Sequence, residues 1–159
     1  MPSSTLMNAD TIEFLTRERA AIVGEAEASV ARMRSHYEAA GVTEVRRRLD
    51  ALFDTLLESL AAQDLGPVIA LAREVAGERF TSGYDLTEVQ SAFNALEAAT
   101  WTHVLAELDP GRFAKTLGLV STILGAGKDA LGREYVSLAT DAHAPSLDLR
   151  ALFAGTAGV

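Results

Sequence analysis

Apolar residues recur along this chain in steps of three and four positions, and that spacing predicts α-helices throughout. An α-helix has 3.6 residues per turn, so such steps place apolar side chains on one face. No stretch rich in Val, Ile and Thr alternates apolar and polar residues as a strand would. The pattern therefore predicts an all-α fold, an antiparallel helical bundle of about five helices, which a globin-like packing would also satisfy.

Capping residues, glycines and prolines divide the pattern into helices. Asp10 and Glu13 have the spacing of a capping box, so we expect Asp10 to cap the first helix. Asp85 opens the fourth helix in the same way, and Asp109 followed by Pro110 opens the fifth. The expected helices cover residues 11–40, 43–63, 67–82, 85–108 and 110–142.

The 159 residues amount to one domain, and no internal repeat or low-complexity tract divides them. We expect a flexible N-terminus over residues 1–9, a single helical domain over 10–143 and a C-terminal tail over 144–159. The tail contains apolar residues but ends in a Gly-Thr-Ala-Gly segment that we expect to fray.

Charge and cysteine content narrow the possible partners. The formal net charge of −8 argues against nucleic acid as a partner, because the phosphate backbone would repel this surface. The basic run Arg46–Arg48 lies between Glu44 and Asp50 and is typical of a solvated helix face. The chain has no cysteine, no basic and apolar leader, and no apolar run of about 20 residues, so we expect a cytoplasmic location and no membrane partner.

Two helices carry stripes of small residues. Gly118, Gly125 and Gly132 are seven residues apart in the fifth helix. Each mid-helix glycine costs roughly 0.5–1 kcal/mol relative to alanine, a cost that close helix approach would offset. The stripes predict close packing within the chain, a two-fold dimer interface, or a hinge near residues 124–127. The first helix carries the fainter stripe, which includes Ala20, Gly24 and Ala28.

No motif in the chain marks an enzyme or a metal centre. The segment Thr122–Asp129 fails the phosphate-loop pattern, which needs glycine at position 122 and Ser or Thr at 129. None of the three histidines lies in an HExxH or Glu-x-x-His pattern, and no Gly-x-Ser-x-Gly elbow is present. We therefore expect no catalytic residue, no metal site and no cofactor.

Aromatic residues gather around the junction of the third and fourth helices. They are either core residues or the lining of a ligand pocket. In a globin-like fold, His103 would be the candidate axial ligand of a haem, although nothing else in the chain specifies haem. The candidate pocket consists of Phe80, Tyr84, Phe93, Trp101 and His103.

The same junction, residues 79–101, resembles the N-terminal domain of the RsbR/RsbRD co-antagonist proteins of the bacterial stressosome. The shared pattern is a basic residue, a glycine-aromatic turn, an acidic helix start and apolar positions that end near a tryptophan. The helix plan between Ile12 and Leu138 also fits the family. The pattern residues here are Arg79, Gly83, Tyr84, Glu88, Phe93, Leu96 and Trp101.

The resemblance implies a helical, non-haem-globin-like domain that forms homodimers and acts as a sensor or binds a regulatory protein. We expect a non-catalytic signalling domain in which helix packing transmits a ligand or partner signal. The alternative is a globin-like protein that binds a small ligand or haem. Family members usually continue into an output domain, whereas this chain ends soon after the last expected helix, so it is either a stand-alone version or part of a larger regulator.

Overall fold

The computed structural model describes residues 4–33, 42–83 and 86–143, and within those ranges it contains five α-helices and no strand. This confirms the predicted all-α fold. The helices are α1 (Ser4–Met33), α2 (Val42–Ala62), α3 (Gly66–Thr81), α4 (Leu86–Glu107) and α5 (Pro110–His143).

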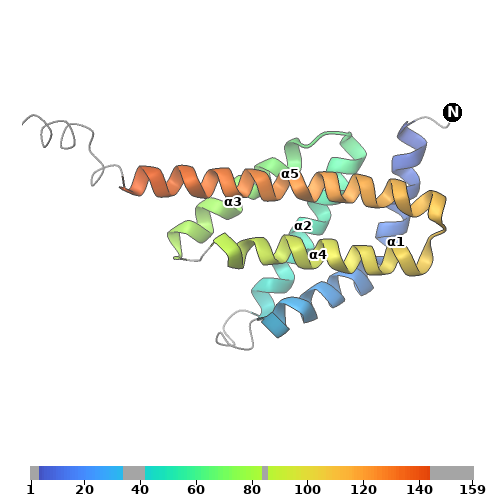
Figure 1. Cartoon of the computed structure of the whole chain (residues 1–159), viewed down its shortest axis with the longest axis horizontal. Coiled ribbons are helices and arrows are strands. Elements are labelled where there is room, and N and C mark those ends of the chain that lie inside the picture. The colour runs from blue at the N-terminus through green and yellow to red at the C-terminus, as the bar shows by residue number, and fades with distance from the viewer. Residues whose placement is uncertain (1–3, 34–41, 84–85, 144–159) are drawn as a thin grey trace, which may run out of the picture.

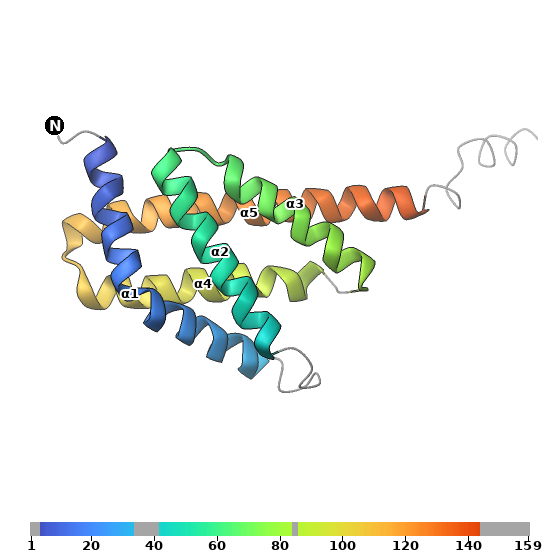
Figure 2. The same cartoon turned by 180° about the vertical axis from the view of Figure 1, so that it is seen from behind.

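The helices form two layers. In Figure 1, α4 and α5 run side by side in opposite directions in front, and α1, α2 and α3 lie behind them. Seen from behind in Figure 2, α1, α2 and α3 cross the α4–α5 pair, and the C-terminal part of α5 extends beyond its neighbours. The α4–α5 pair therefore has an inner face against the other three helices and an outer face toward solvent.

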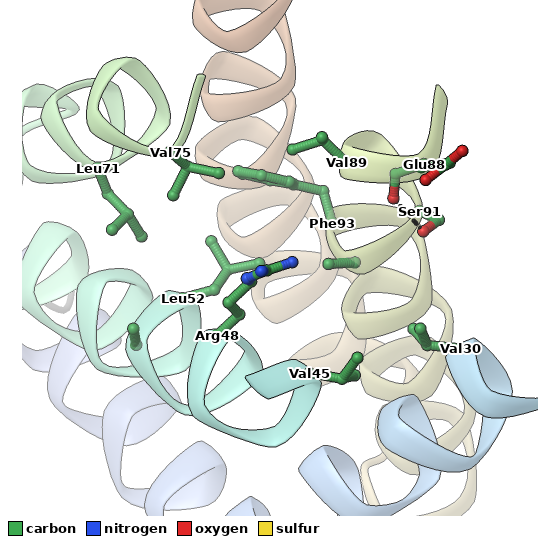
Figure 3. A pocket seen from close by; sticks show the side chains of 12 residues that line it. Val30, Val45, Arg48, Leu52, Leu71, Val75, Glu88, Val89, Ser91 and Phe93 are labelled. Carbon is green, nitrogen blue, oxygen red and sulfur yellow. Dashed lines mark hydrogen bonds between the residues drawn. The ribbon is translucent and has the colours of Figure 1, made fainter. Parts of the chain in front are cut away.

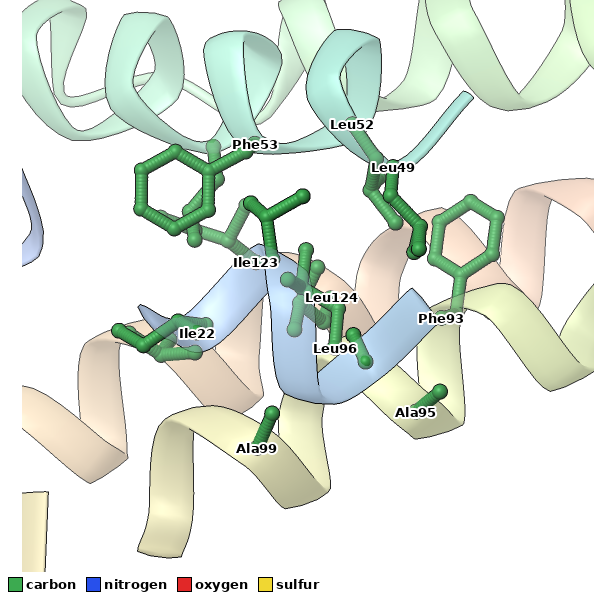
Figure 4. Close-up of a cluster of buried hydrophobic side chains, with 14 of the residues drawn as sticks. Ile22, Leu49, Leu52, Phe53, Phe93, Ala95, Leu96, Ala99, Ile123 and Leu124 are labelled. Carbon is green, nitrogen blue, oxygen red and sulfur yellow. The ribbon is translucent and has the colours of Figure 1, made fainter. Parts of the chain in front are cut away.

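The hydrophobic core lies between these layers. All five helices supply buried apolar side chains, as their three- and four-residue spacing predicts. Figure 4 shows labelled side chains of α1, α2, α4 and α5 packed against one another in this core. The fully buried members there include Ile22 of α1, Leu49 and Phe53 of α2, Leu96 of α4 and Leu124 of α5.

Several of the predicted capping and turn residues lie at helix ends, as expected. The Asp109 carboxylate accepts a hydrogen bond from the Arg112 backbone N–H at 3.1 Å, so the cap before Pro110 is confirmed. Gly83 follows α3 with a φ of +79°, a left-handed conformation that glycine adopts without steric cost. Asp64 similarly accepts a hydrogen bond from the Gly66 N–H before α3.

The start of α1 differs from the prediction, because Asp10 is not its cap. The helix begins at Ser4, so residues 4–9, which we expected in a flexible N-terminus, are helical. Tertiary contacts hold this first part: the buried Asn8 side-chain amide donates to the Leu60 carbonyl at 3.0 Å. Asp10 instead forms an ion pair with Arg112 of α5, at 2.8 Å. The predicted stop at Gly41, the cap at Asp85 and the tail 144–159 lie outside the described residues.

Ion pairs join α1 to α2 along the edge of the bundle. The Arg19 guanidinium donates to the Asp54 carboxylate at 2.6 Å and packs 4.9 Å from the centroid of the Phe53 ring. Burial alone would lower the pKa of Arg19, but its hydrogen bonds and charge interactions with Asp54 and Asp50 raise that pKa above its usual value. Arg19 therefore stays charged at every physiological pH.

Candidate functional site

A cavity of about 60 Å³ lies where α1, α2, α3 and α4 approach one another. Its walls are mostly aliphatic, with one aromatic ring, because the apolar stripes of four helices point toward it (Figure 3). At the roughly 30 Å³ that a water occupies in the liquid, this volume corresponds to about two water positions. The main apolar wall residues are Val30, Val45, Leu52, Leu71, Val75, Val89 and Phe93.

The cavity also has a charged wall. Arg48 of α2 lines it, and Figure 3 shows the guanidinium group in the space between α2 and α4. The same group forms an ion pair with the Glu44 carboxylate at 2.6 Å. Arg79 of α3 also reaches Glu44, at 2.5 Å, and its side chain is only 6% exposed. Basic side chains from two helices thus converge on Glu44, and one of them, Arg48, lines the cavity.

Phe93 links this cavity to α5. Its side chain lines the cavity and is 3% exposed. On the α5 side, a Cβ built at Gly127 would lie 2.7 Å from Phe93 Cε1 and 2.9 Å from Val68 Cγ2. Both distances are shorter than van der Waals contact, so only glycine lets α5 approach α3 and α4 this closely. Phe93 therefore lies between the cavity and the α5 backbone at Gly127.

The described residues of the predicted pocket lie in different surroundings. Phe93 is the member of that set, among its described residues, that lines the cavity. Phe80 packs edge-on against Tyr135 of α5, with ring centroids 5.9 Å apart. Trp101 is 42% exposed on α4, and Tyr84 lies outside the described residues.

His103 faces α1 and not the cavity. Its Nε2 lies 3.0 Å from a Glu25 carboxylate oxygen, and its Nδ1 lies 3.8 Å from one of Glu18. A haem ligand needs an apolar pocket with an open face, whereas the neighbours of this imidazole are two carboxylates. The surroundings of His103 therefore do not fit a haem ligand.

The predicted small-residue stripes lie on solvent-facing surfaces. A Cβ added at Gly118 or Gly125 would meet nothing within 4 Å, and one at Gly132 would meet only the Gln90 amide at 3.9 Å. Packing within the chain therefore does not require glycine at these three positions. The continuous α5 also has no break at residues 124–127. The stripe of α1 is equally open, with Ala20 and Ala28 exposed and nothing within 4 Å of a Cβ at Gly24.

The α5 stripe borders an uncharged patch on the outer face of the α4–α5 pair. The Trp101 indole N–H donates to the Ser121 hydroxyl at 3.4 Å, which places the indole beside the stripe. Leu105, one turn further along α4, is 53% exposed. The exposed Ala98 precedes Trp101 on the same face of α4. We refer to this patch, formed by Ala98, Trp101, Leu105, Gly118, Ser121 and Gly125, as the outer patch.

Within the described ranges, no group of three or more His, Asp or Glu side chains is arranged to hold a metal ion. None of the helices there has a segment both long and apolar enough to span a bilayer. The Thr122–Asp129 segment, which failed the phosphate-loop pattern, is internal to α5.

Sequence reasoning missed Arg48 as a cavity residue, because the run Arg46–Arg48 was interpreted as a solvated face. The structure separates its members: the Arg47 side chain is 75% exposed, whereas that of Arg48 is 19% exposed. The position of Arg48 relative to its apolar neighbours in the sequence could have indicated this role. Arg48 lies three residues after Val45 and four before Leu52, which places it beside the apolar stripe of α2.

Comparison with known proteins gives one family. No curated protein is similar enough to this chain to count as a match. The family model of the RsbT co-antagonist protein rsbRD N-terminal domain matches residues 17–151, which is most of the chain and includes α2 to α5 in full. The match agrees with the resemblance carried by residues 79–101, and the chain therefore belongs to the family of RsbT co-antagonist protein rsbRD N-terminal domains.

Proposed function

We propose that this chain is a non-catalytic signalling domain that pairs with a second copy of itself through the outer patch. Family membership supports a sensor or signalling role in a co-antagonist protein. The observation that carries the pairing is the outer patch, where an exposed tryptophan and leucine lie beside glycines that the isolated chain does not need.

The composition of the outer patch suits an interface between copies. Exposed apolar patches rimmed by polar residues mark protein interfaces, and tryptophan is enriched in their centres. Charged pairs follow this patch along α5: Lys128 contacts Glu97 of α4 at 3.5 Å, and Arg133 contacts Asp129 at 3.0 Å. Glycines on a helix surface permit close approach of a second helix, which offsets their cost to helix stability.

The signal travels through Phe93 and α5. Phe93 contacts the cavity on one side and the Gly127 region of α5 on the other. Gly125, two residues earlier on α5, belongs to the outer patch. Because a packed core has discrete arrangements, a shift of Phe93 that repositions α5 changes the geometry of the paired helices. This is the route by which a ligand or a regulatory protein partner alters the output.

Sedimentation velocity at micromolar concentration tests the pairing. We expect the unmodified chain to sediment as a dimer and the Leu105→Glu variant as a monomer, because a buried charge opposes association. The matched control is Leu65→Glu, which places the same charge on another exposed leucine, 37% exposed, in the turn before α3. A monomeric unmodified chain, or equal sedimentation of the two variants, would reject the proposal.

A further inference from the structure

We infer that the cavity between α1, α2, α3 and α4 binds a short aliphatic carboxylate, with its hydrocarbon tail against Phe93 and its carboxylate on Arg48. This names the ligand for the signalling role proposed above and in that respect rests on it. The binding itself is a separate property, which can be measured whether or not the chains pair.

The cavity walls determine the tail. Val45, Leu52, Val75 and Val89 supply aliphatic surface, and Phe93 closes the side toward α5. This aliphatic part of the lining favours an apolar occupant over water, because it offers none of the two to four polar partners that a water needs. A volume of about 60 Å³ limits the buried part to about two or three carbon atoms, since a cavity of roughly 150 Å³ holds the six carbons of benzene.

Arg48 determines the head group. A guanidinium has five N–H donors and binds carboxylates in a planar, two-pronged geometry. Arg48 already contacts Glu44 at 2.6 Å, and Glu44 also contacts Arg79 and, at 3.6 Å, Arg47. A ligand carboxylate would share Arg48 with Glu44, which keeps Arg79 and Arg47 as its other cationic partners. Glu88, the acidic residue at the cavity, is exposed, and Figure 3 shows its carboxylate turned away from Arg48.

A chain-length series of carboxylates tests the tail. The full chain is titrated with acetate, butanoate, pentanoate and octanoate, and binding is followed by amide chemical shifts in NMR spectra. Affinity should rise about fourfold for each added CH₂ and stop rising once about two or three carbons are buried. Affinity that does not depend on chain length would overturn the assignment.

A neutral analogue and two arginine variants test the head group. We expect pentanol to bind the unmodified chain about tenfold more weakly than pentanoate, because it cannot form the charge-assisted hydrogen bonds. Arg48→Gln should remove that preference, whereas the neighbouring Arg47→Gln, which does not line the cavity, should keep it. Equal binding of the acid and the alcohol to the unmodified chain would overturn the carboxylate assignment without relying on any variant.

A variant that fills the cavity tests its location. Ala92→Phe places a ring in the cavity and should abolish pentanoate binding, whereas Ala70→Phe, on the exposed side of α3, should leave binding unchanged. Circular dichroism verifies that both variants are folded. Pentanoate shifts that persist in folded Ala92→Phe would reject this site. Sedimentation of the ligand-free samples distinguishes the two proposals. If the chain is a monomer and binds pentanoate, the proposed pairing is wrong. If the chain is a dimer and does not bind pentanoate, the proposed ligand is wrong.

Discussion

Gly125 and Gly127 are two residues apart on α5, yet their surroundings are opposite. At Gly127, on the inner face, a Cβ would lie 2.7 Å from Phe93 and 2.9 Å from Val68. At Gly125, on the outer face, a Cβ would meet nothing within 4 Å. Folding of the isolated chain therefore explains the glycine at 127 but not the glycine at 125.

The same contrast holds for the two faces of the α4–α5 pair as a whole. On the inner face, Leu96 and Leu124 are fully buried against α1, α2 and α3. On the outer face, Trp101 and Leu105 keep 42% and 53% of their surface exposed. Burial in the core therefore accounts for the apolar residues on the inner face but not for Trp101 and Leu105 on the outer face.

The largest expected difference between the faces concerns leucine truncation. Leu124→Ala should lower the free energy of unfolding by about 2–5 kcal/mol, because it leaves a cavity in the packed core. Leu105→Ala should change that energy by less than about 0.5 kcal/mol, because the side chain is half exposed. Urea denaturation of dilute protein measures both without a contribution from pairing. Similar losses for the two variants would mean that the outer face is part of the core.

The two glycines give the next prediction, with opposite signs. Gly127→Ala should destabilise the chain by roughly 1–2 kcal/mol, because overpacking against Phe93 and Val68 outweighs the better helix propensity. Gly125→Ala should stabilise dilute protein by about 0.5–1 kcal/mol, since alanine favours the helix and meets no neighbour. Thermal unfolding checks both, and a stable Gly127→Ala variant would contradict the close approach of α5.

Substitutions at one glycine of each small-residue stripe test which of the two stripes lies in the dimer interface. Gly125→Leu should weaken dimerisation at least about tenfold, since the added side chain holds the partner helix away. Gly24→Leu is the matched control, because a Cβ there also meets nothing within 4 Å but lies on α1, outside the outer patch. The dimer dissociation constant from sedimentation is the measurement. If Gly24→Leu were the variant that weakens dimerisation, the interface would lie on α1.

The smallest expected effect is at the edge between α1 and α4. Glu25→Gln removes the carboxylate that contacts His103 at 3.0 Å. The Glu25 side chain is 41% exposed, so solvent screens the interaction and the change in unfolding free energy should stay below about 0.5 kcal/mol. A loss above about 1 kcal/mol, measured by urea denaturation at pH 6, would show that His103 is a structural anchor.

Local signals made most of the fold predictable from the sequence. The cap at Asp109 and the stop at Gly83 act within a few residues, so the bounds of α3 and α5 differ from prediction by one residue at most. The start of α1 was not predictable in this way. The contacts of Asn8 with Leu60 and of Asp10 with Arg112 join residues far apart in sequence, and they decide where the helix begins.

The candidate site was less predictable, because it depends on where helices cross. Phe93 was identified from its place in the aromatic junction, but Trp101 and His103 point to other surfaces of α4. Arg48 was hidden in a basic run whose members face different directions around α2. Helical spacing predicts which face of its own helix a residue occupies. Predicting which residues line this cavity also requires the relative positions of four helices.

The accessibility of a single thiol tests the proposed pairing most directly. The chain has no cysteine, so Thr122→Cys introduces one thiol beside the outer patch, and Ala70→Cys places one on the exposed side of α3. The reaction rate with a thiol reagent is followed from dilute to concentrated protein. Pairing through the outer patch predicts that Thr122→Cys reacts more slowly as concentration rises, while Ala70→Cys does not change. Equal, concentration-independent rates at both positions would contradict it.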